Sequence, residues 1–222
     1  MVAISCISHS SWNLIAKRNV QQGDFFWWSL FCVMSALLLP VMIGLWWMPL
    51  PFACWVLGVK SGAFIGLYFA SLSMAYRLGD MSIIYPLARS APLFLLTWTA
   101  IVMGVRFDVY GYIGVGLVGL GAVVLPMFTG LGWRRWFNMA NLWAMVTALA
   151  TTGYSLCDHA TMNIIEKNYA GTFDHVARSV CYLWIQFSFG WVVLSLLTQF
   201  TTSKNMFRII RFLAVVLTDN CG

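Results

Sequence analysis

Residues 66–104 read GLYFASLSMAYRLGDMSIIYPLARSAPLFLLTWTAIVMG, a long apolar stretch that carries only three charged residues. A membrane-spanning helix needs about 20 mostly apolar residues, because the hydrocarbon core of a bilayer is about 30 Å thick. The stretch contains the second half of one segment of that length, at 55–76, and the whole of another, at 81–104. Membrane-spanning strands would instead alternate apolar and polar residues over about 10 positions. The stretch therefore predicts helices that cross a membrane.

The composition of the whole chain supports the same prediction. Its 222 residues are 61% hydrophobic and only 9% charged, and the mean hydropathy is +0.81. Soluble domains are about 45–50% apolar and about 25% charged, so this chain is too apolar for a soluble, disordered or nucleic-acid-binding protein. The net charge of +6 is spread thinly along the chain. We expect the lipid bilayer as a partner and no nucleic acid.

The same length criterion gives seven spans and one shorter apolar fragment. The spans are expected at 2–16, 25–47, 55–76, 81–104, 109–127, 139–156 and 180–200, and the fragment at 206–217. Tryptophans gather near several of the predicted span ends, where amphipathic rings prefer the headgroup level. We therefore expect an all-α integral membrane protein with about seven or eight transmembrane helices.

Arg89 is the charged residue placed most deeply in a predicted span. A central arginine costs about 2.5–3.5 kcal/mol on insertion scales, which makes it a candidate functional residue. Helical spacing places Ser82, Tyr85 and Arg89 on one face. Pro86 and Pro92 each lack a backbone N–H and are expected to break the helix there, as in the binding sites of many transporters. The alternative is that Arg89 pairs with a carbonyl group and only holds helices together.

Polar residues also form a stripe along the 139–156 span and just beyond it. Its members are Thr147, Thr151, Tyr154, Ser155 and Asp158, followed by His159. The stripe fits the lining of a substrate path, with proton coupling through Asp158 or His159 as a further role. The alternative is hydrogen bonding between packed helices, worth about 0.6 kcal/mol per bond.

Small residues predict close contacts between helices. One stripe consists of Gly62, Gly66 and Ala70, and five glycines crowd the span at 109–127. Lys60 and Arg178 lie near span ends, and we expect their charges to reach the headgroup level. The six cysteines show no metal-binding or redox spacing and are expected to be free thiols.

No catalytic or metal-binding pattern stands out in the sequence. The three histidines are scattered, and neither HExxH nor GxSxG occurs. No two carboxylates share a predicted span, as a paired acid and base would require. We expect a protein that is not an enzyme and that uses no cofactor and no metal ion.

A weak internal repeat relates SWNL at 11–14 to GYSL at 153–156, five spans later. A repeat unit with an odd number of spans is inverted across the membrane, which gives the two halves opposite access. Beyond this repeat, the chain resembles the EamA family of the drug/metabolite transporter superfamily. The resemblance is carried by SWNLIAKR at 11–18, by S-x-x-Y-P-L-x-R-x-x-P within 66–104, and by GYIGVGLVGLGAVVLPM at 111–127.

The resemblance implies a carrier or exporter of small metabolites or drugs that works by alternating access around a cavity at mid-membrane. The family fold has two inverted five-helix repeats. The chain would hold a first repeat at 1–128, a connecting loop at 129–138 and a partial second repeat at 139–222. Residues implied to line the cavity, and thus to bind the small-molecule substrate, are Trp12, Asn13, Tyr85, Arg89 and Tyr154.

The second repeat implied by the family would extend well past residue 222, so we expect a product truncated at its C-terminus. A homodimer is one way in which two chains would complete each other. Two further functions remain open: a non-transporting membrane subunit or inactive remnant, and a flippase of lipid-linked substrates. The resemblance implies a bacterial inner membrane as the location.

Overall fold

The computed structural model describes residues 11–12, 14–18, 25–47, 49–102, 104, 108–128, 138–169 and 174–202. Every regular element within these ranges is a helix, which confirms the all-α prediction for them. The helices are α2 (Phe25–Trp47), α3 (Phe52–Leu78), α4 (Met81–Ala88), α5 (Ala91–Val102), α6 (Val109–Phe128), α7 (Met139–Tyr169) and α8 (His175–Thr202).

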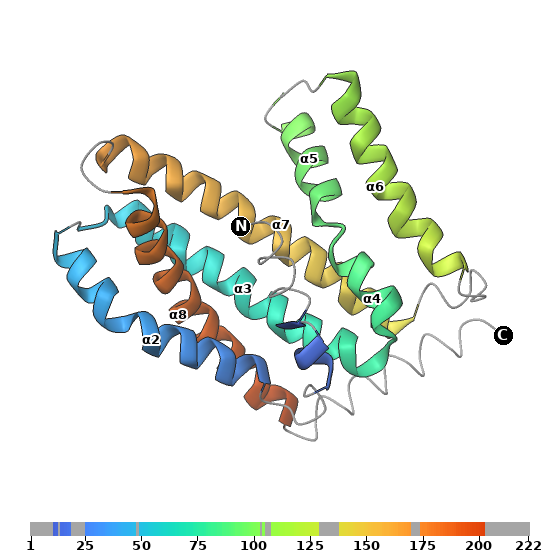
Figure 1. Ribbon diagram of the computed structural model, residues 1–222, viewed down its shortest axis with the longest axis horizontal. Helices are drawn as coiled ribbons and strands as arrows, with labels where there is room; N and C mark the ends of the chain where they lie inside the picture. The colour runs from blue at the N-terminus through green and yellow to red at the C-terminus, as the bar shows by residue number, and fades with distance from the viewer. Residues whose placement is uncertain are drawn as a thin grey trace.

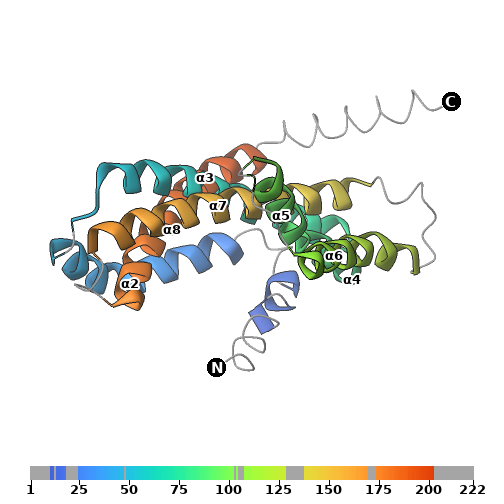
Figure 2. The same cartoon turned by 90° about the horizontal axis from the view of Figure 1, so that it is seen from above.

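Four long helices, α2, α3, α7 and α8, form the main bundle (Figure 1). Helix α3 packs along both α7 and α8, and α8 also packs along α2. The shorter helices α4, α5 and α6 gather toward one end of the bundle, as the view turned by 90° shows (Figure 2). Two prolines at 49–51 separate α2 from α3, since proline cannot continue the hydrogen-bond ladder of a helix.

Glycines allow α3 and α8 to approach closely. A Cβ atom added at Gly62 would lie 2.4 Å from Cβ of Phe189 and 2.9 Å from the backbone nitrogen of Gly190. A Cβ at Gly58 or Gly66 would come within 2.7 Å of a side chain of α8. Gly58, Gly62 and Gly66 recur every four residues and therefore lie on one face of α3. This glycine contact confirms the prediction made for Gly62 and Gly66.

The glycines of α6 behave differently. A Cβ added at Gly114, Gly116 or Gly121 would meet nothing within 4 Å in the described part of the chain, and one at Gly119 would lie 3.4 Å from Leu93. The prediction that these glycines mark close helix contacts is wrong for the first three. The reason is that α6 packs along one side only, against α5 and α4.

Polar side chains join the long helices at several levels. The hydroxyl oxygens of Ser71 on α3 and Thr147 on α7 lie 2.9 Å apart. The indole N–H of Trp27 on α2 donates to Oγ of Ser195 on α8 at 2.8 Å. These bonds satisfy polar groups that would otherwise be unpaired between apolar surfaces.

The buried residues form two clusters, one toward each end of the bundle. The first joins α2, α3, α4, α7 and α8 and includes Phe69, Leu72, Tyr76, Ile84 and Leu87. The second joins α2, α3, α7 and α8 and includes Val41, Cys54, Ile165, Tyr182 and Ile185. Each cluster draws on helices far apart in the sequence, so their packing fixes which helices are neighbours.

Two helical stretches of the described chain, Phe52–Leu78 and His175–Thr198, are long and apolar enough to cross a membrane by length and composition. Three shorter apolar helices begin at residues 26, 81 and 109. Predicted spans and observed helices differ most at α7, which continues to Tyr169 instead of ending near residue 156. Polar residues end the apolar run there without ending the helix. The fragment at 206–217 lies outside the described residues.

Candidate functional site

The predicted break in the 81–104 segment is present, and Arg89 lies at it. Helix α4 ends at Ala88 and α5 begins at Ala91. The backbone N–H of Arg89 donates to the carbonyl oxygens of Tyr85 and Pro86, at 3.1 and 3.2 Å. Pro92 in the first turn of α5 has no N–H to continue the ladder from α4, which accounts for the interruption.

The guanidinium group of Arg89 lies over the ring of Tyr85. Its central carbon is 5.5 Å from the ring centroid, within the range of a cation–π interaction. Arg89 also follows the C-terminal end of α4, where the helix dipole favours a positive charge. Both residues are half-buried. The structure therefore brings together two of the residues implied by the resemblance.

Tyrosines from two other helices complete this group. The rings of Tyr68 on α3 and Tyr154 on α7 meet edge to face, with centroids 6.0 Å apart and an interplanar angle of 90°. Both tyrosines pack against the apolar cluster that includes Leu87 and Ala88, the two residues before Arg89. We call Arg89, Tyr68, Tyr85 and Tyr154 the arginine–tyrosine cluster. It joins α3, α4 and α7.

A series of aromatic rings connects Trp12 to the cluster. Its ring centroid is 6.0 Å from that of Phe26, which is 5.2 Å from Phe69. Phe69 in turn lies 4.9 Å from Tyr68. Trp12 thus belongs to the same apolar cluster as Tyr154. Asn13 lies outside the described residues.

Lys17 holds the segment that carries Trp12 against the end of α3. Its ammonium group donates to the carbonyl oxygen of Gly79 at 2.7 Å and also to that of Tyr76. The last carbonyl groups of a helix have no partner within it, and a cation there also interacts favourably with the helix dipole. This lysine therefore positions Trp12 relative to α3.

Asp80 begins α4 and so positions Arg89 from the other side. Its carboxylate accepts a hydrogen bond from the backbone N–H of Ser82 at 2.9 Å, the usual arrangement of an N-cap. Hydrogen bonds from the backbone and side chain of Ser82, with a smaller contribution from Lys17, hold the pKa of Asp80 below its usual value. Neither Lys17 nor Asp80 was predicted from the sequence to be a positioning residue.

The cluster offers one cation, three phenol groups and apolar aromatic faces. Such a set can bind an anionic or polar group of a small molecule by charge and hydrogen bonding. Within the described ranges, no three His, Cys, Asp or Glu side chains gather as a metal site requires.

Tyr68 was not predicted from the sequence, because no motif or spacing links α3 to the polar stripe of α7.

The prediction that Arg178 reaches toward a headgroup level is wrong. Its side chain is only 3% exposed and forms an ion pair with Glu166. It also donates to Nδ1 of His175 at 2.9 Å. The reason is the length of α7, which carries Glu166 as a helical residue beside the first turn of α8. Lys60, in contrast, is exposed.

Comparisons of the chain with protein-family models, with curated proteins and with solved structures gave no match.

Proposed function

We propose that this chain is an integral membrane transporter of the EamA type, which moves small metabolites or drugs by alternating access. The apolar composition and the two helices of membrane-spanning length support a membrane location. The sequence resemblance supports the family. The arginine–tyrosine cluster supports a binding site between α3, α4 and α7.

The observation that carries the proposal is the position of Arg89 at the interruption between α4 and α5. A guanidinium among apolar helices is costly unless its charge is used or compensated. Here the ring of Tyr85 lies at 5.5 Å, and the charge acts on the hydroxyls of two further tyrosines. In the proposed carrier, Arg89 binds an anionic or polar part of the substrate, and the tyrosines orient the rest.

Alternating access would follow from the inverted repeat. In this proposal residues 1–128 form one repeat, and residues 139–222 belong to the second. Tyr154 in α7 then occupies the place in the second repeat that Trp12 occupies in the first. Both pack against one apolar cluster, so the two proposed repeats meet there.

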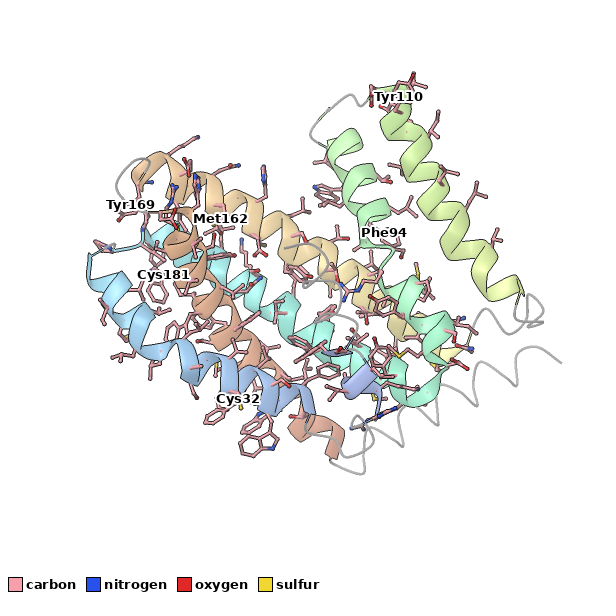
Figure 3. The ribbon with its side chains drawn as sticks, in the orientation of Figure 1. Cys32, Phe94, Tyr110, Met162, Tyr169 and Cys181 are labelled. Atoms are coloured by element: carbon pink, nitrogen blue, oxygen red, sulfur yellow. The ribbon has the colours of Figure 1, made fainter. Side chains whose placement is uncertain are left out.

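A second candidate is a non-transporting membrane subunit, and one observation favours it. Helix α6 presents an apolar face that the described residues do not cover. Its exposed residues include Tyr110, Ile113, Leu117 and Leu120. Figure 3 shows Tyr110, which is 82% exposed, at the free end of α6, pointing away from the bundle.

Flux measurements separate the two functions. The purified chain is reconstituted into liposomes, and uptake is measured for a panel of radiolabelled amino acids, sugar phosphates and cationic dyes. A transporter takes up at least one compound, and Arg89→Gln lowers that uptake by about tenfold or more, since a hydrogen bond to a charged group is lost. The exposed Arg18 provides the control variant, Arg18→Gln. Equal uptake by wild type and Arg89→Gln would remove Arg89 from the mechanism. If no compound is taken up and a second membrane protein co-purifies stably with the chain, the result would favour a subunit.

A further inference from the structure

A carboxylate lies where α3, α7 and α8 meet, outside the arginine–tyrosine cluster. Oδ1 of Asp158 on α7 accepts from Oγ of Ser61 at 2.6 Å, from the hydroxyl of Tyr182 at 2.8 Å and from Nε2 of Gln186 at 2.9 Å. Oδ2 lies 3.0 Å from the same amide nitrogen. The amide nitrogen also donates to Oγ of Ser61 at 2.7 Å. The four side chains form one connected network.

The network is buried between apolar helices. Ser61 is 0%, Gln186 3% and Tyr182 4% exposed, and Asp158 itself is half-buried. Neither of the two ion pairs found among the described residues includes Asp158. A carboxylate in such a place is costly unless it is paired or neutralised, and an ionisable residue at membrane depth is a functional candidate.

The chemistry of the partners is compatible with neutralisation by a proton. Hydroxyl and amide groups can either donate or accept, whereas lysine and arginine only donate. Ser61, Tyr182 and Gln186 can therefore satisfy both a carboxylate and a carboxylic acid. Oδ1 already accepts three bonds, while Oδ2 accepts one, so Oδ2 has the room for a proton. Rotation of the Gln186 amide would present its oxygen to the new O–H group.

The network is also connected to the arginine–tyrosine cluster. Asp158 and Tyr154 are four residues apart in α7 and lie on the same face. The charge of Asp158 acts on the hydroxyl of Tyr154, as does the charge of Arg89. A change of charge at Asp158 therefore changes the electrostatic environment of the proposed substrate site.

Other titratable and charged side chains lie on α7 and on the helices packed against it. They are Tyr154, Cys157 and His159 on α7, Lys60 on α3, Tyr85 on α4, Arg89 just after α4, and Arg178 and Cys181 on α8. His159 is exposed, and its Nε2 lies 3.2 Å from Nδ2 of Asn163. Lys60 is exposed and acts on Cys157, and Arg178 is engaged with Glu166.

We propose that Asp158 is a reversible proton-binding site, protonated at Oδ2, and that this proton is the coupling ion of the carrier. The second part rests on the proposed transport function, and the first does not. Binding forms one O–H bond at Oδ2 and neutralises the carboxylate. Release returns the proton to water and restores the four hydrogen-bond contacts described above.

Infrared difference spectroscopy of the full chain in lipid tests the binding site directly. As the pH is lowered, the carbonyl stretch of a protonated carboxyl group is expected to appear, and Asp158→Asn is expected to lack that component. Asp80→Asn, which alters an exposed carboxylate, is a matched control that keeps it. An identical difference spectrum in wild type and Asp158→Asn would overturn the proposal.

A second variant keeps the proposal testable if Asp158→Asn does not fold. Tyr182→Phe removes one donor to the ionised carboxylate and keeps the ring. Because the charged form loses a hydrogen bond, the infrared transition is expected to move to higher pH by about one unit or more. A transition that stays in place or moves to lower pH would contradict a proton at Asp158.

Flux experiments then test coupling separately. An inward proton gradient should accelerate uptake by wild-type liposomes, and Asp158→Asn should be insensitive to the gradient. If the infrared component is present while the gradient has no effect on a measurable uptake, the coupling role fails and the binding site stands. If no compound is taken up at all, the transport function fails, and the infrared result still decides the site.

Discussion

The ammonium group of Lys17 donates to the carbonyl oxygen of Gly79 at 2.7 Å and so ties residues 11–18 to the end of α3. This link crosses 62 positions of sequence and stands directly before Asp80, the N-cap of α4. One lysine therefore holds the segment bearing Trp12, the end of α3 and the start of the helix that leads to Arg89.

We predict that Lys17→Met lowers the free energy of unfolding by about 1.5–3 kcal/mol, the usual contribution of hydrogen bonds to a charged group. The loss leaves the carbonyl oxygens of Tyr76 and Gly79 without this donor. Thermal unfolding in detergent, followed by tryptophan fluorescence, measures the change. The exposed neighbour Arg18→Met is the control, and an equal loss in both variants would contradict a specific role for Lys17.

Replacing a glycine by alanine should lower the stability of the protein in α3 and raise it in α6. Gly62→Ala places a methyl group 2.4 Å from Cβ of Phe189 and is expected to destabilise the protein by about 1–3 kcal/mol. Gly116→Ala meets nothing within 4 Å and should stabilise α6 by up to about 1 kcal/mol. Denaturation midpoints measured under the same conditions test this prediction: the midpoint of Gly62→Ala should lie below that of the wild type, and the midpoint of Gly116→Ala should lie above it.

Asp80 predicts a pH dependence of stability. Folding lowers the pKa of its carboxyl group below the ordinary value of 3.8, so the ionised carboxylate stabilises the folded state. This stabilisation is fully present above pH 3.8 and is lost as the pH falls through the lower pKa of the folded chain. Thermal unfolding measured from neutral pH to below 3.8 should show this loss in the wild type. Asparagine is an equally good N-cap, so Asp80→Asn should remove that part of the pH dependence while keeping α4 intact.

The pair formed by Glu166 and Arg178 should show strong coupling. Glu166→Ala leaves the guanidinium of Arg178 buried without its carboxylate and is expected to cost about 1–3 kcal/mol. The double variant Glu166→Ala/Arg178→Leu should recover part of this loss, because the buried charge is gone as well. A double-mutant cycle by thermal unfolding measures the coupling, and simple additivity would show that the pair is not an energetic unit.

Tyr68 should contribute to binding through its hydroxyl group. Tyr68→Phe keeps the edge-to-face contact with Tyr154 but removes a phenol on which the charge of Arg89 acts. We expect the half-saturation concentration for substrate to rise by about 2–10-fold, since an ordinary hydrogen bond contributes about 0.5–1.5 kcal/mol. Tyr110→Phe on the outer end of α6 is the matched control and should leave uptake unchanged.

Local features of the fold were predictable because they depend on neighbouring residues. The helical class follows from long apolar runs, and the break near Arg89 follows from Pro92, whose missing N–H acts within one turn. The approach of α3 to α8 at Gly62 and Gly66 also follows from spacing, because small residues four apart share a face.

Features that depend on pairing between helices were not predictable in the same way. Ser61, Tyr182 and Gln186 meet Asp158 from two other helices, and nothing in their spacing specifies that these faces oppose each other. The ion pair of Arg178 was missed because apolar content marks where a span ends and not where a helix ends. Tyr68 reads as an ordinary residue of an apolar helix until α7 is placed beside it.

The glycine contact between α3 and α8 has a consequence for motion. The backbone of α3 at Gly62 and Gly66 lies directly against the backbone of α8 and the first side-chain atoms of Phe189 and Val193, which leaves little room for the two helices to slide. They should move as a single rigid body, together with the carboxylate network that lies between them and α7. In the proposed carrier, opening of the arginine–tyrosine cluster would then depend on the connection at Arg89 and Ser90 between α4 and α5.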